Sequence, residues 1–242
     1  MRWIGSLIAI LLFFALCVEA KVYLVAVGIS DYPGTENDLR LPADDANDIA
    51  RLYRDNATVT YKTLLNSDAT KQNILSSMRK LYGEASQNDI VVFYFSGHGY
   101  PNGFCAHDGN LTYGEMRKAM ASSPCKNKMI FADACYSGGL RSNRKQRKHN
   151  AVSTAKKANI MLFLASRDDE LSIERRNMKN GMFTAFLLKG LSGAADKDKD
   201  RIITAFEIFD YVHGSVVKAT HQKQHPVMWG KFENYMPVMV WK

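Results

Sequence analysis

A histidine and a cysteine, each set beside glycines, are the residues of this sequence with the clearest capacity for chemistry. His98 lies in the segment SGHG at the end of the apolar run 89–96, and Cys135 lies in DACYSGG at the end of the run 128–134. A thiol needs a base to become a nucleophile, and histidine is its usual partner. Either residue alone would be more typical of a structural role, but together they predict a catalytic Cys–His dyad.

The elements that must position this pair alternate between apolar strands and amphipathic helices. Most of the expected strands are apolar on both faces, which is typical of a parallel sheet covered by helices on both sides. We therefore predict an α/β fold with a mostly parallel central sheet of about six strands. In such sheets the site lies beyond the carboxyl ends of the strands, where both motifs fall. The expected strands are 21–29, 58–65, 89–96, 128–134 and 160–166, with an edge strand or tail at 237–241; the expected helices are 43–53, 70–82, 183–191 and 205–217.

Acidic residues near the two motifs predict the specificity of the site. Asp133 lies two residues before Cys135, so on a strand both side chains face the same way. A carboxylate opposes thiolate formation, so Asp133 suits a cationic substrate side chain better than it suits the thiol. Asp168 and Asp169, after the next strand, are further candidates for this pocket. The alternative is that Asp133 orients His98.

Three segments resemble the catalytic domain of caspase-like peptidases, and above all metacaspases, paracaspases and their bacterial relatives. They are YFSGHG, DACYSGG and the opening GISDYPGTENDLRLPADDA; the later stretches ASRDDELSIE and GMFTAFLLKGLSGAAD are also similar. The resemblance covers nearly all of residues 21–242. It implies a three-layer caspase-like fold. The pentapeptide typical of animal caspases is absent, so cleavage after aspartate is not implied.

The resemblance also implies roles for individual residues. Cys135 would attack the peptide carbonyl to form an acyl-enzyme, and His98 would take and return the proton. The backbone N–H groups of Gly99 and Cys135 would hold the oxyanion. Asp45, in the segment corresponding to the family's Asn-Asp-Ala, would be the second acid of the pocket. The alternative for Asp44 and Asp45 is that they cap the helix they begin.

The formal charge of +8 comes almost entirely from the segment 140–159. This segment has no acid and no aromatic residue that could stack on bases, which argues against nucleic-acid binding. Its composition predicts a mobile loop. Because the loop follows Cys135 closely and carries the side chains that an acidic pocket binds, it is a candidate self-processing site; a surface loop without a role is the alternative. The processing candidates are Arg141, Arg144, Lys145, Arg147 and Lys148.

The N-terminus has the layout of a secretory signal peptide. Arg2 precedes an apolar run from Ile4 to Val18, and Val18-Glu19-Ala20 forms a small-x-small cleavage site. The run is short for a membrane span of about 20 residues. We therefore expect removal of residues 1–20 and export of one domain, 21–242, with no membrane contact after cleavage. An uncleaved anchor is the alternative.

Export changes how the remaining cysteines are interpreted. Cleavage leaves Cys105, Cys125 and Cys135, an odd number. In an oxidising compartment at least one thiol would stay free or reactive, and pairing of Cys105 with Cys125 would leave Cys135. The alternative is that all three are unpaired.

An acidic loop near the C-terminus matches part of a calcium-loop template. Arg201 replaces the glycine that the template needs, and no helix is expected to lead in closely beyond Leu191. Thr204 and Glu207 also form an ordinary capping box, which is the interpretation we prefer. We expect no required cofactor, because the scattered histidines also lack zinc spacing; calcium dependence through another site stays open. The residues at template positions are Asp196, Asp198, Asp200, Thr204 and Glu207.

Together these features predict an exported, caspase-like cysteine endopeptidase that cleaves protein or peptide substrates after Arg or Lys. The alternative is a catalytically silent caspase-like module that binds peptides or partners.

Overall fold

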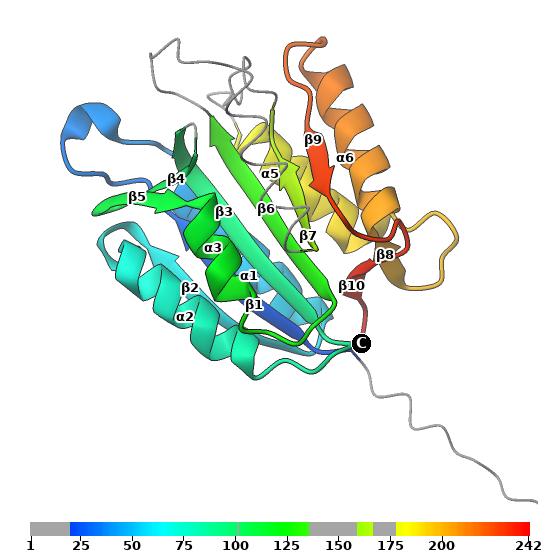
Figure 1. Ribbon diagram of the computed structural model, residues 1–242. Helices are drawn as coiled ribbons and strands as arrows, with labels where there is room; N and C mark the ends of the chain where they lie inside the picture. Colours follow the sequence, from blue (N-terminus) through cyan, green and yellow to red (C-terminus); the bar gives the residue numbers. More distant parts are fainter. Residues whose placement is uncertain (1–19, 101, 136–158, 167–177) are drawn as a thin grey trace, which may run out of the picture.

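The computed structural model describes residues 20–100, 102–135, 159–166 and 178–242 (Figure 1). Its centre is a sheet with the strand order β2-β1-β3-β6-β7-β9. Neighbouring strands are parallel throughout this path except at β9, which runs antiparallel to β7. The strands are β1 (Val22–Gly28), β2 (Val59–Leu65), β3 (Ile90–Tyr100), β6 (Asn127–Cys135), β7 (Ile160–Leu164) and β9 (Val227–Gly230).

The central strands are buried on both faces because helices cover the sheet on each side (Figure 1). All seven residues of β1 and all five residues of β7 are buried, as their continuous apolar runs predict. One face packs against α2 (Lys71–Gly83) and α3 (Tyr113–Met120). The other face packs against α1 (Pro42–Asn56), α5 (Met182–Lys189) and α6 (Ala205–Ala219).

The helix boundaries follow from local sequence signals. Pro42 opens α1, where its missing N–H costs nothing and its fixed φ suits the first turn. The side chain of Thr70 caps α2. Capping boxes begin α3 at Thr112 and α6 at Thr204, where in each case a glutamate three residues on completes the reciprocal bonds.

The predicted α/β architecture with a mostly parallel sheet of about six strands is confirmed. Prediction missed several short elements: the hairpin β4 (Gly103–Ala106) and β5 (Gly109–Thr112), helix α3, and strands β8 (Ile202–Thr204) and β9. These strands have three or four residues, too few for a clear alternation of apolar and polar positions. The expected tail strand is β10 (Pro237–Val240), which pairs antiparallel with β8.

Several expectations fall on parts of the chain outside the described residues. They are the signal peptide, apart from residue 20, and nearly all of the basic segment, with its five processing candidates. Within the described part of the chain, no helix is long and apolar enough to cross a membrane. Cys105 and Cys125 are both free, and the Cys125 thiol donates to the carbonyl of Asp89 at 2.7 Å.

Candidate active site

The two predicted chemical motifs meet at the carboxyl end of the sheet. Strands β3 and β6 are parallel neighbours in continuous register from Ile90 opposite Asn127 to His98 opposite Cys135. Neighbouring strands lie about 4.8 Å apart. The backbone therefore places the histidine and the cysteine side by side at the ends of two central strands, the position where sites form in such sheets.

The imidazole of His98 has a defined tautomer. Its Nε2 lies 2.8 Å from the carbonyl oxygen of Asn37, in the loop that follows β1. A carbonyl can only accept, so Nε2 carries the proton and Nδ1 is the nitrogen that can take one. The ring also packs against Tyr32, with centroids 4.8 Å apart. In its neutral form His98 can therefore act as a base through Nδ1.

Tyr32 fixes the backbone of the histidine as well as its ring. The Tyr32 hydroxyl accepts a hydrogen bond from the backbone N–H of His98 at 3.0 Å and donates to the carbonyl of Cys105 at 3.1 Å. Gly97 makes this approach possible. It has φ +153°, and a Cβ there would lie 2.6 Å from the Tyr32 hydroxyl. A glycine is therefore required immediately before the histidine.

Two carboxylates lie buried beside this pair. Asp45 and Asp133 are only 1% and 7% exposed. Gly181 lies next to both, since a Cβ on it would be 2.3 Å from Asp133 Oδ2 and 3.3 Å from Asp45 Oδ2. The structure thus brings together two of the predicted pocket residues, which lie 88 positions apart in the sequence.

Hydrogen bonds from uncharged groups hold Asp45. Its Oδ2 accepts from the Ser96 hydroxyl at 2.9 Å, and its Oδ1 accepts from the Asn180 amide at 3.0 Å and the Gly181 N–H at 3.1 Å. These donors come from β3 and from the start of α5, not from the first turn of α1. The capping alternative for Asp45 is therefore wrong, and α1 begins without a side-chain cap. Asp44 is exposed.

The pKa of Asp45 reflects this environment. Burial raises the pKa of its carboxyl to about 8, and the nearby charge of Asp133 adds to the rise. The hydrogen bonds from Asn180, Ser96 and Gly181 act in the opposite direction. Burial and the neighbouring negative charge therefore favour retention of a proton on Asp45.

Other predicted residues are placed as follows. Gly99 is buried in β3 and pairs with Phe104 of β4. Asp168 and Asp169 lie outside the described residues, as does the side chain of Cys135. The role of Asp133 in orienting His98 stays a prediction.

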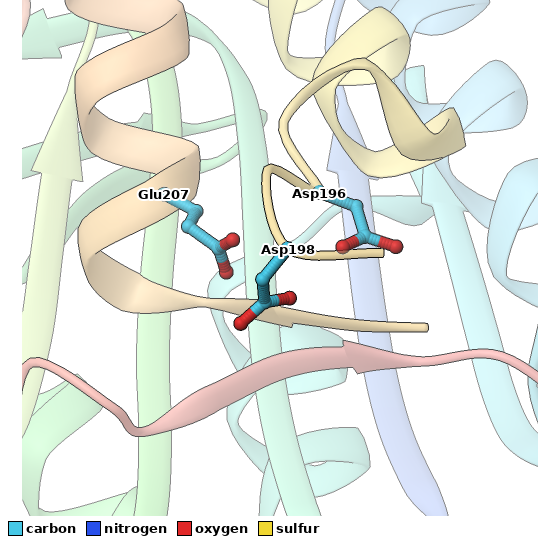
Figure 2. A group of neighbouring side chains, drawn as sticks. All are labelled: Asp196, Asp198 and Glu207. Atoms are coloured by element: carbon cyan, nitrogen blue, oxygen red, sulfur yellow. The ribbon is translucent and has the colours of Figure 1, made fainter. Parts of the chain in front are cut away.

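The acidic loop before α6 has both features that its sequence suggested, a cluster of carboxylates and a capping box. Figure 2 shows Asp196, Asp198 and Glu207, whose carboxylate oxygens lie within 4.8 Å of one another. Glu207 completes the capping box, and Asp196 accepts the backbone N–H groups of Lys199 and Arg201. The helix before this loop, α5, continues into a turn over Gly190–Ala194 that is broken at Gly193, where φ is +109°.

Comparison with known proteins agrees with this geometry. The model of the caspase domain family matches residues 21–234. The chain belongs to the caspase domain family. This membership groups the chain with the caspase-like cysteine peptidases.

Curated relatives of this caspase domain are metacaspases. It is 29% identical to metacaspase-4 of Arabidopsis thaliana over 199 residues, which cover 71% of this chain and 44% of the relative. It is 33% identical to metacaspase-1 of Candida albicans over 150 residues, or 47% of this chain and 32% of the relative. The chain thus spans less than half the length of these relatives.

Solved structures share the fold of this caspase domain. A Geobacter sulfurreducens protein matches with a TM-score of 0.66 and 18% identity, covering 92% of this chain and all of that one. The structure of pro-sf-caspase-1 matches with a TM-score of 0.63 and 13% identity, covering 93% and 95%. At these identities the likeness concerns the fold.

Sequence reasoning missed the residues that surround the acids and the histidine. Tyr32, Asn180 and Thr184 were not singled out, and Ser96 was given no role, although it is the first residue of the SGHG motif and lies opposite Asp133 on the neighbouring strand. That shared register was the available signal. Asn180 and Thr184 carried none, because only the packing of α5 against the sheet brings them to the carboxylates.

Proposed function

We propose that this caspase domain hydrolyses peptide bonds with Cys135 as nucleophile and His98 as base. The observation that carries this proposal is the register that pairs the two residues at the carboxyl ends of adjacent parallel strands. His98 Nδ1 takes the thiol proton, and the thiolate attacks the peptide carbonyl. His98 then returns the proton to the leaving amine, and water hydrolyses the acyl-enzyme. The N–H groups of Gly99 and Cys135 serve as oxyanion donors.

We further propose that cleavage follows Arg or Lys. Asp45 and Asp133 supply two buried acidic side chains next to the dyad. A buried carboxylate is costly unless a cation or strong donors compensate it. The groups that donate hydrogen bonds to Asp45, from Ser96, Asn180 and Gly181, are uncharged. A guanidinium or ammonium group of the substrate would compensate the pair, whereas an aspartate side chain would be repelled.

Two finer features extend the proposal. The signal-like N-terminus supports export, and the basic segment 141–148 supplies Arg and Lys residues for self-processing. N-terminal sequencing of the protein purified from its own source tests export, because signal-peptide removal predicts a chain that starts near residue 21.

Incubation of the wild type beside Cys135→Ala, followed by sequencing of new N-termini, tests self-processing. Cuts within 141–148 in the wild type alone support it, and an intact wild type that cleaves Arg peptides refutes it.

A fluorogenic peptide panel with Arg, Lys, Asp or Asn at the cleavage position tests the proposed activity. We expect release from the Arg and Lys peptides by the wild type and none by Cys135→Ala. Preference for Asp would refute the acidic-pocket argument. No release from any peptide, with folded protein, would favour the silent binding module.

A further inference from the structure

The first turn of α5 contacts both buried acids. Thr184 donates twice to Asp133: its backbone N–H and its hydroxyl lie 3.1 and 2.8 Å from Asp133 Oδ2. Asn180 and the N–H of Gly181 account for Asp45 Oδ1. One short segment therefore holds two carboxylates that come from α1 and from β6.

The hydrogen bonds to Asp133 have a defined direction. Burial raises the pKa of Tyr94 well above its usual value, so its hydroxyl remains a donor. The Tyr94 and Thr184 hydroxyl oxygens are 2.6 Å apart, and both side chains are fully buried. A threonine hydroxyl has one proton, which it gives to the carboxylate, so the Tyr94 hydroxyl must donate to Thr184. Tyr94 thus donates to Thr184, and Thr184 donates to Asp133, so both hydrogen bonds point toward the carboxylate.

We propose that Thr184 is a positioning residue of the specificity pocket, which fixes Asp133 in its ionised form to receive the substrate cation. This inference rests on the proposed cleavage after Arg or Lys. Hydrogen bonds to a charged carboxylate favour the charged form, and linked donors polarise one another. Asp45 tends to keep its proton, so Asp133 is the member of the pair that carries the negative charge of the pocket.

A purely structural role for Thr184 predicts a different set of effects. It would change the stability of the fold without changing how substrate binding depends on pH. The positioning role instead predicts that loss of the hydroxyl raises the pH at which Asp133 ionises. In the part of the chain that the structure describes, titratable residues near Asp133 include Asp45 on α1, Tyr94 on β3 and, two residues further along the paired strands, His98 and Cys135. The last two are common to every variant below, so their titration cancels in the comparison.

The test compares kcat/KM for an Arg peptide between pH 5 and 9 in four proteins. Thr184→Val keeps the shape and removes the hydroxyl, while Thr184→Ser keeps the hydroxyl. Thr220→Val is the matched control, because Thr220 is also a buried threonine whose hydroxyl is hydrogen bonded, at the end of α6. The wild type completes the set.

We expect Thr184→Val to move the acid limb of the profile up by about one pH unit, and so to lower kcat/KM by up to about tenfold on that limb, mainly through KM. Thr184→Ser should restore the wild-type limb, and Thr220→Val should not move it. If Thr184→Val does not fold, Tyr94→Phe provides the test, with a smaller shift in the same direction. An unmoved limb in Thr184→Val, or in Tyr94→Phe if that variant is used, overturns the inference.

Asp133→Asn separates this inference from the proposed function. If the wild type cleaves Arg peptides and Asp133→Asn does not, while Thr184→Val keeps the wild-type profile, the positioning role alone is wrong. If the wild type cleaves no Arg or Lys peptide, the proposed specificity is wrong as well.

Discussion

At the scale of single residues, the site combines a histidine of defined orientation with two buried carboxyl groups. The bond from His98 Nε2 to the carbonyl of Asn37 fixes which nitrogen can accept a proton. Burial raises the pKa of Asp45 and the charge of Asp133 adds to the rise, so ionisation of Asp45 is opposed in spite of its hydrogen bonds. A carboxyl group that the fold holds in an environment unfavourable to its charge is typical of a functional site, because such a loss of stability is usually kept only where the residue serves activity.

Asp45→Asn should therefore stabilise the protein at high pH while impairing Arg cleavage. The folded pKa lies above the unfolded value, so the folded state binds more protons between about pH 4 and 8, and wild-type stability falls as the pH rises through that window. Asparagine does not titrate, and its amide can bond to Ser96 in place of the carboxylate oxygen. The difference in the free energy of unfolding between Asp45→Asn and the wild type should increase by at most about 1.4 kcal/mol for each pH unit.

Urea unfolding at pH 5 and pH 8.5 measures this gain. Lower stability of Asp45→Asn than of the wild type at pH 8.5 would contradict the account.

At the scale of elements, the start of α5 contacts both carboxylates of the proposed acidic pocket. Gly181 must lack a side chain because a Cβ would overlap Asp133 Oδ2 at 2.3 Å. Gly181→Ala should displace the carboxylates and lower kcat/KM for Arg peptides by at least tenfold. Gly214→Ala is the control, since nothing lies within 4 Å of a Cβ there and it sits within α6. Equal activity of the two variants would argue against the pocket.

The capping box that begins α6 gives a second prediction at this scale. Thr204→Ala removes the cap and should lower the free energy of unfolding by about 1 kcal/mol in EDTA. Burial acts to raise the pKa of Glu207, but hydrogen bonds from Thr204 and Lys197 outweigh it and lower the pKa. The stability due to Glu207 is therefore present above its unfolded pKa and is lost as the pH falls through the folded value.

Chemical unfolding with and without calcium checks this interpretation. A loss that appears only when calcium is present would contradict capping as the role of this loop.

At the scale of the whole molecule, the fold assembles one site from segments far apart in the sequence. Prediction succeeded where the sequence signal is local. Apolar runs predicted the central strands, and the histidine and cysteine motifs marked the carboxyl ends of two of them. It could also place Asp133, because alternation along a strand fixes which side chains share a face. It could not find Asn180 or Thr184, whose helix meets the carboxylates only through tertiary packing. The short hairpin after His98 was missed for lack of periodicity.

Covalent labelling with an arginyl chloromethyl ketone, followed by peptide mapping, tests the central claim most directly. We predict an adduct on Cys135 in the wild type and much slower labelling in His98→Ala. Burial raises the pKa of Cys105 and raises that of Cys125 to about 11, so both should stay unmodified. Labelling of Cys105 or Cys125 in place of Cys135, or an unchanged rate in His98→Ala, would contradict the account.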